Sequence, residues 1–150
     1  ETGRKVVLAF AGDHAPSFVD HVADKTRAEG NDLQILERST PFFIWANYPL
    51  ENIDAATSTA DSLNRMDMVM LAPTIAQQAV LPLTGYYKYL LAMKQQTPVV
   101  TAANDYMKVD GTTGTYGEDE SLDAWVKGYL ALEYNNIGAH AKRVQSIFGQ

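Results

Sequence analysis

The clearest apolar pattern in the chain is a run of six residues near its start, Val6 to Ala11, which ends abruptly at Gly12-Asp13-His14. The run does not alternate with polar residues, which is typical of a strand buried on both faces of a parallel sheet. A shorter aromatic run, Phe42 to Trp45, predicts a second core strand, and Pro98 to Thr101 predicts a third. The chain is therefore expected to form its core around a sheet, with the first strand at its centre.

Apolar residues at helical spacing predict helices between these strands. Phe18 to Ala28 predicts a short surface helix or turn. Met66 to Val80 is helix-like but contains Pro73, so a helix either begins near Pro73 or is kinked there. Thr84 is expected to cap a further helix that runs to about residue 96.

The remaining segments are defined mainly by turn residues. Gly30 to Asp32 predicts a turn, and Leu33 to Glu37 predicts a link or the beginning of a strand. Glu51 to Asn64 predicts a loosely ordered surface connection, and Asp110 to Gly117 predicts a hairpin turn between short extended pieces. Ser121 is expected to cap the last helix. The predicted buried stripe of that helix comprises Leu122, Trp125, Val126, Tyr129 and Leu130.

Composition is consistent with one α/β domain, since 150 residues with 46% hydrophobic content can form a core. Residues 1–3 belong to no periodic element and are interpreted as a remnant of expression, so residues 4–150 carry the fold. The net charge of −6 gives no electrostatic attraction to nucleic acid or to an anionic membrane. No apolar run approaches the roughly 20 residues of a membrane helix. Because the chain has no cysteine, disulfides and thiolate metal sites are excluded.

Asp13 and His14 are the main candidates for chemistry, because ligands of open α/β sheets bind beyond the carboxyl ends of the strands. Gly12 is expected to allow a tight turn there. A carboxylate oxygen beside an imidazole nitrogen suits zinc or manganese, although a metal centre needs three or four protein ligands. In the alternative interpretation, Asp13 caps a helix and His14 is a hydrogen-bonded turn residue. His21 is a second candidate ligand, but an exposed helix histidine is the preferred interpretation.

Two further groups of residues have a functional and a structural interpretation. Trp45, Asn47 and Tyr48 could line a pocket for glycerol or sugar hydroxyls, but core packing for Trp45 and a turn for Asn47 are preferred. A second group of acids suggests calcium, but it lacks the ligand spacing of a calcium loop, so solvated loop acids are preferred. These acids are Asp105, Asp110, Glu118, Asp119 and Glu120.

Several motifs in order resemble one enzyme family. GDHAPSF after a buried strand resembles the metal-binding segment of lipoteichoic acid synthase-like phosphoglycerol transferases, in the sulfatase and alkaline phosphatase superfamily. LERSTPFFIWANYPLE resembles the family's next strand, and LAPTIAQQAVLPLTGYYKYLLAM resembles its helix, Leu-Pro break and Tyr-rich second helix. LDAWVKGYLALEYNNIG resembles its closing helix. The resemblance extends from Lys5 to about Phe148, and the order of the motifs is more specific than any one of them.

The resemblance implies the fold and the activity. The fold would be the C-terminal portion of an alkaline-phosphatase/sulfatase-like sandwich, a central sheet flanked by helices, with a small antiparallel ribbon near Lys108 to Tyr116. Asp13 and His14 would bind a divalent cation, manganese in the first place and magnesium or zinc as alternatives. A nucleophilic Thr and a metal-binding Glu would come from an upstream part of the enzyme, so this chain alone is expected to be inactive.

The implied reaction transfers glycerophosphate from a phospholipid to a polyglycerolphosphate chain or surface glycan. The implied location is the outer face of a bacterial membrane, with an anchor outside this chain. A related sulfatase or phosphoethanolamine transferase would use the same Asp-His pair. A non-catalytic module that binds glycan or protein is the alternative from a different class, with Asp13 and His14 as structural residues.

Overall fold

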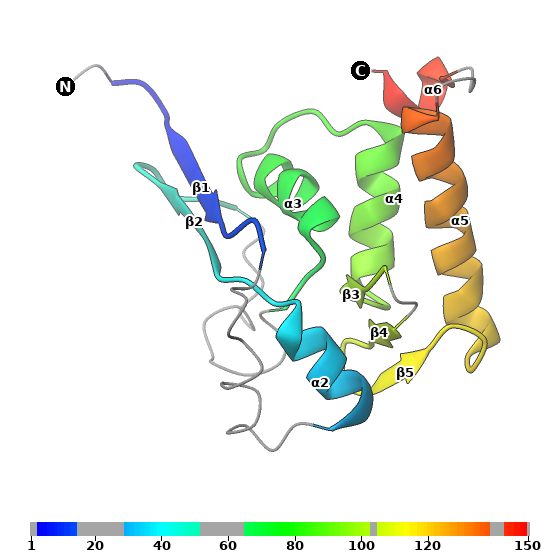
Figure 1. Cartoon of the computed structure of the whole chain (residues 1–150). Helices are drawn as coiled ribbons and strands as arrows, with labels where there is room; N and C mark the ends of the chain where they lie inside the picture. Colours follow the sequence, from blue (N-terminus) through cyan, green and yellow to red (C-terminus); the bar gives the residue numbers. More distant parts are fainter. Residues whose placement is uncertain (1–2, 15–28, 52–64, 103–104, 139–142, 150) are drawn as a thin grey trace. The chain divides into compact units, whose positions relative to one another are not determined.

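The chain folds into two compact units, Glu1–Leu50 and Glu51–Gln150 (Figure 1). The computed structural model describes residues 3–14, 29–51, 65–102, 105–138 and 143–149. These residues form two small antiparallel sheets and five α-helices, so the expected α/β class is confirmed at this level. The sulfatase-like sandwich remains a prediction. The predicted helix or turn at 18–28, with His21, and nearly all of the predicted connection at 51–64 lie outside the described residues.

In the first unit, β1 (Val7–Ala11) pairs with β2 (Phe42–Ala46) in antiparallel orientation. The strand predicted at Phe42 to Trp45 is confirmed, but none of its residues is buried, so its prediction as a core strand is wrong. The parallel pairing expected for the first strand is wrong for this neighbour, and in the described residues the first strand belongs to a two-stranded sheet instead of lying at the centre of a larger one. Burial of β1 on both faces is also wrong, because Leu8 and Phe10 are 52% and 51% exposed. An unbroken apolar run shows that both faces are apolar, but it contains no information about strand direction or about what covers each face.

One face of this sheet carries large apolar side chains. Residues that oppose each other in the register point to the same side, and Leu8 opposes Trp45 while Phe10 opposes Phe43. The rings of Phe10 and Phe43 stack with centroids 5.5 Å apart. We call this surface the apolar face; its members are each about half exposed, and they are Val6, Leu8, Phe10, Phe43 and Trp45.

Along the chain, the helix α2 (Gly30–Glu37) comes between β1 and β2. The sequence analysis predicted a turn in this segment, followed by a link or the beginning of a strand. That prediction was wrong. Gly30 does adopt the left-handed φ of 57° that suits a turn glycine, but the helix begins at this residue. Asp32 lies in the first turn, where a carboxylate complements the helix dipole, and Ile35 is buried. Burial of Ile35 depends on tertiary packing, which local turn signals do not report.

The second unit begins with a 3-10 turn, η3 (Met68–Met70), and continues with α3 (Leu71–Gln78) and α4 (Gly85–Lys94). Pro73 is the third residue of α3, so the prediction that a helix starts near it is confirmed. Thr84 caps α4 as predicted, since its hydroxyl accepts a hydrogen bond from Tyr87 N–H at 3.1 Å. None of the helices among the described residues is both long and apolar enough to cross a membrane.

The end of α3 has an unusual backbone conformation at Val80. Val80 N–H donates to Gln77 O, and Leu81 N–H donates to Ala76 O, which is the hydrogen-bond pattern of a Schellman motif. The residue that such a motif holds in the left-handed region is commonly glycine, but here it is Val80 with φ 57°. A β-branched residue in this region is strained.

A three-stranded ribbon and a long helix complete the second unit. The ribbon has the order β3 (Val99–Val100), β4 (Asp105–Met107) and β5 (Thr113–Thr115), all antiparallel, which confirms the predicted third strand and the presence of a hairpin. The bounds of the predicted turn, Asp110 to Gly117, are wrong, because β5 lies within them. α5 (Glu120–Ile137) lies beside α4, and the short α6 (Gln145–Phe148) contacts the N-terminal end of α4 (Figure 1). Four apolar side chains of the core are almost completely buried: Met70, Leu90, Met93 and Met107.

Two details of α5 correct the sequence-based predictions. Asp119, not Ser121, is the N-cap, and its carboxylate accepts from the N–H groups of Ser121 and Leu122. Both residue types cap helices, so the pattern alone did not distinguish them. Within the predicted stripe, Leu122 and Val126 are buried, whereas Leu130 is 54% exposed.

Candidate functional site

Asp13 and His14 directly follow β1, and the backbone before them is tied to the segment that precedes β2. Gly12 N–H donates to Pro41 O at 3.0 Å. Thr40 Oγ1 donates to Gly12 O, also at 3.0 Å. Both polar backbone groups of Gly12 are therefore hydrogen-bonded, which fixes the point from which the candidate ligands project.

Gly12 has a different structural role from the one predicted. The sequence suggested a turn glycine, but Gly12 is not among the glycines with positive φ, which in the described residues are 3, 30, 111 and 117. Instead, a methyl group at this position would lie 2.9 Å from Thr40 Cβ, closer than two carbon atoms normally approach. The site needs glycine because the Thr40 side chain packs directly against its Cα.

The two candidate ligands converge. Asp13 Oδ2 lies 3.4 Å from His14 Nε2, and Asp13 Oδ1 accepts a hydrogen bond from His14 N–H at 3.0 Å. Two atoms bound at about 2.1 Å to one tetrahedral ion would be separated by roughly 3.4 Å, so this spacing fits a shared divalent cation. Both side chains are open to solvent, with 88% of Asp13 and 77% of His14 exposed.

A complete metal centre would need further ligands. Among the described residues, no group of three or more His, Asp or Glu side chains is arranged to hold a metal ion. Within the described residues, the pair therefore offers one carboxylate and one imidazole to a cation. The alternative role of Asp13 as a helix cap concerns residues 15–28, which lie outside the described part of the chain.

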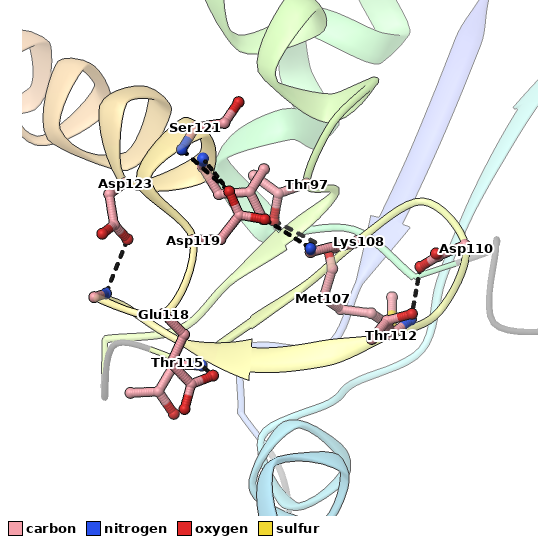
Figure 2. Close-up of polar contacts among 12 residues, drawn as sticks. Thr97, Met107, Lys108, Asp110, Thr112, Thr115, Glu118, Asp119, Ser121 and Asp123 are labelled. Atoms are coloured by element: carbon pink, nitrogen blue, oxygen red, sulfur yellow. Dashed lines mark hydrogen bonds and ion pairs between the residues drawn. The ribbon is translucent and has the colours of Figure 1, made fainter.

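Three of the acids that were weighed as calcium ligands have structural partners (Figure 2). Asp119 forms an ion pair with Lys108 at 2.7 Å in addition to capping α5. Glu118 accepts from Thr115 N–H at 2.9 Å, and Asp110 accepts from Thr112 N–H at the same distance (Figure 2). The hydrogen bond with Lys108 is the main reason that the pKa of Asp119 is lowered. Asp119 therefore joins the ribbon to the start of α5, whereas Glu118 and Asp110 stabilise the turns beside β5.

One of these acids is not solvated as predicted. Asp105 on β4 is only 7% exposed. Its carboxylate oxygens lie 3.5 Å from the hydroxyls of Thr101 and Thr115, on the neighbouring segments of the ribbon. Antiparallel pairing places the side chains of Asp105 and Thr115 opposite each other. The loop composition did not reveal this position, because burial depends on the strand register.

The aromatic and amide candidates near β2 also have structural roles. Asn47 Oδ1 accepts from Val6 N–H at 2.8 Å, and Asn47 Nδ2 donates to Arg4 O at 2.9 Å. The Asn47 side chain therefore continues the hydrogen bonding between β1 and β2 beyond the end of their backbone pairing. The Lys5 ammonium lies 4.9 Å from the centre of the Tyr48 ring. Trp45 is 53% exposed, so the preferred prediction that it is a core residue was wrong.

A polar cluster between α4 and α5 was not predicted from the sequence. The Tyr86 hydroxyl donates a short hydrogen bond to the Glu133 carboxylate, and the Tyr86 ring packs on Phe148. Burial raises the pKa of Asp67, and the nearby negative charge of Glu133 adds to this rise. Burial also raises the pKa of Tyr129 to about 12. Tyr86 and Glu133 are 47 residues apart, and no local signal connects them.

A shallow hollow lies between α3 and α4, but its lining lacks the groups needed for catalysis. Tyr87 is the lining residue with a polar group, and the other lining residues are apolar: Ala72, Ile75, Ala76, Leu81 and Pro82. Ligand sites combine an apolar wall with a few converging polar groups. The Asp13–His14 pair therefore remains the better candidate site.

Comparison of the chain with protein-family models, with curated proteins and with solved structures gave no match.

Proposed function

We propose that this chain is the C-terminal part of the catalytic domain of an extracytoplasmic, metal-dependent phosphoglycerol transferase. The observation that carries the proposal is the 3.4 Å spacing of Asp13 Oδ2 and His14 Nε2 at the end of β1. The sequence resemblance described above supports it independently, since the pair occupies the position of the family's metal-binding Asp-His.

Each residue of the pair would contribute a different property to the site. The Asp13 carboxylate supplies negative charge, and the His14 imidazole supplies a neutral nitrogen donor when it is deprotonated. A divalent cation bound there would neutralise phosphate charge and lower the pKa of a hydroxyl nucleophile. Manganese is the cation that the resemblance favours, with magnesium or zinc as alternatives. The nucleophilic Thr and a metal-binding Glu would lie outside this chain, in the upstream part of the enzyme.

The proposed reaction is a double displacement at phosphorus. The Thr oxygen would attack the phosphodiester of a phospholipid such as phosphatidylglycerol, and the bond to the diacylglycerol oxygen would break. The diacylglycerol oxygen would take up the proton lost by the Thr hydroxyl, and diacylglycerol would leave. A hydroxyl of a polyglycerolphosphate chain or surface glycan would then attack the phosphorus, the bond to the Thr oxygen would break, and the proton of the acceptor hydroxyl would restore the Thr hydroxyl. A membrane anchor outside this chain would keep the enzyme at the bacterial cell surface.

The test is manganese binding, measured from the electron paramagnetic resonance signal of the free ion. The measurement uses this chain and the longer polypeptide that includes its upstream part. Asp13→Asn and His14→Ala are the variants, and Asp110→Asn is the matched control, because Asp110 is a carboxylate that accepts from Thr112 N–H in a turn and is not part of the candidate site.

We expect binding that both site variants abolish and that the control preserves, with higher affinity in the longer polypeptide. Loss of binding in the Asp110 variant, or equal binding in the two site variants and the unmodified protein, would contradict the metal site. The remaining interpretation would then be the non-catalytic module. If binding follows the expected pattern, assays with phospholipid, sulfate ester and phosphoethanolamine donors distinguish the transferase from its relatives.

A further inference from the structure

The hydroxyl of Thr40 forms a hydrogen bond with the backbone directly before the Asp13–His14 pair. Thr40 Oγ1 donates to Gly12 O at 3.0 Å. This oxygen belongs to the peptide bond that joins Gly12 to Asp13. The rigid plane of that peptide bond determines the direction in which Asp13 leaves the strand. Hydrogen bonding to its oxygen therefore restricts the orientation of the first candidate ligand.

The contact depends equally on the residue at position 12. A methyl group there would lie 2.9 Å from Thr40 Cβ and 3.4 Å from Thr40 Oγ1. Any larger residue would push Thr40 away from the peptide oxygen. Gly12 N–H is already bonded to Pro41 O, the residue after Thr40, so the backbone cannot move away freely. Gly12 and Thr40 thus act as a pair, one by its missing side chain and the other by its hydroxyl.

We infer that Thr40 is a positioning residue for the Asp13–His14 metal pair, an inference that rests on the proposed function. Thr40 does not contact the cation. It acts through the Gly12–Asp13 peptide, whose orientation sets the direction in which the Asp13 side chain leaves the backbone toward the shared cation. Outer groups that orient metal ligands typically affect affinity by about 10- to 100-fold.

The experiment compares manganese affinity, measured by paramagnetic resonance, among four variants of the chain. Thr40→Val removes the hydroxyl while keeping the shape, and we expect it to weaken binding by about tenfold or more. Thr40→Ser retains the hydroxyl and should retain the affinity. Gly12→Ala tests the same contact from the other side and should also weaken binding. Ser39→Ala is the matched control, because Ser39 Oγ donates to Ile35 O and not to Gly12.

Each result decides between the two proposals. Unchanged affinity in Thr40→Val overturns the positioning role of Thr40, even if Asp13→Asn abolishes binding. Unchanged affinity in Asp13→Asn overturns the metal site itself. Circular dichroism and the urea midpoint report folding separately, and a purely structural role would shift the midpoint without separating Thr40→Val from Thr40→Ser in affinity. If Thr40→Val fails to fold, Gly12→Ala decides, and wild-type affinity in that variant overturns the inference.

Discussion

The packing of α4 on α5 depends on a glycine in the middle of α5, which allows a quantitative test. Gly128 faces Tyr89 of α4, whose hydroxyl donates to Trp125 O at 2.7 Å. A methyl group at position 128 would overlap the Tyr89 oxygen and lie 3.1 Å from the ring carbon that bears it. The Tyr89 and Trp125 rings are in contact, with centroids 5.3 Å apart, so the tyrosine cannot move without losing that contact.

Opposing contributions determine the expected effect of Gly128→Ala. Alanine gains about 1 kcal/mol over glycine in a helix interior. Overpacking costs about 1–3 kcal/mol. Displacement of Tyr89 loses a hydrogen bond worth about 1 kcal/mol. We therefore expect Gly128→Ala to lower the free energy of unfolding by about 1–3 kcal/mol, and Tyr89→Phe to lower it by about 1 kcal/mol.

The double variant shows whether the Tyr89 hydroxyl causes the loss of stability in Gly128→Ala. Without the Tyr89 hydroxyl, the nearest contact of the new methyl is the ring carbon at 3.1 Å, which a small shift can accommodate. In the Tyr89→Phe background, Gly128→Ala should therefore be neutral or stabilising, by up to about 1 kcal/mol. The assay is urea unfolding of all four proteins, followed by circular dichroism and tryptophan fluorescence. Ala131→Gly, at an exposed position of the same helix, calibrates the propensity contribution.

A coupling energy near zero in this cycle would refute the reasoning, since residues that do not touch contribute additively. In that case the cost of Gly128→Ala would be unrelated to the Tyr89 hydroxyl. The proposed contact between Gly128 of α5 and the Tyr89 hydroxyl of α4 would then be refuted.

Two further variants test local features of the second unit. The pKa of Asp119 is lowered from 3.8, first by the hydrogen bond with Lys108, so its stabilisation exists above that value and disappears as the pH falls through the lower folded-state pKa. The pKa of Lys108 is raised from 10.5, so the stabilisation that Lys108 contributes is present below that value and is lost as the pH rises through the folded-state pKa. Asp119→Asn should thus reduce the difference in urea midpoint between neutral and acidic pH, and an unchanged acid limb would disprove the pairing. Val80→Gly should raise the free energy of unfolding by up to about 1 kcal/mol, because it relieves a left-handed β-branched residue that is 62% exposed. The control, Val109→Gly, changes a valine without positive φ and should destabilise; equal effects of the two variants would argue against strain at Val80.

Local signals predicted the parts of this fold that depend on neighbouring residues. Thr84 was recognised as a cap because its hydroxyl bonds an N–H three residues later. Pro73 indicated either a helix start or a kink, and it lies in the first turn of α3, where proline needs no N–H partner. The ribbon was recognised from its turn, where Gly111 adopts a φ of 86°. In each case the determining interaction spans only a few residues.

The sequence by itself also identified Asp13 and His14 as a candidate pair, since their residue types and their place after an apolar run do not depend on distant contacts. Only the tertiary structure determined that β1 and β2 run antiparallel, that Gly12 makes room for Thr40, and that Tyr86 donates to Glu133. Thr40 is 28 residues from Gly12, and Glu133 is 47 residues from Tyr86. Contacts over such separations leave no periodic trace in the sequence. They depend on strand register and helix packing, which form only when the whole chain folds.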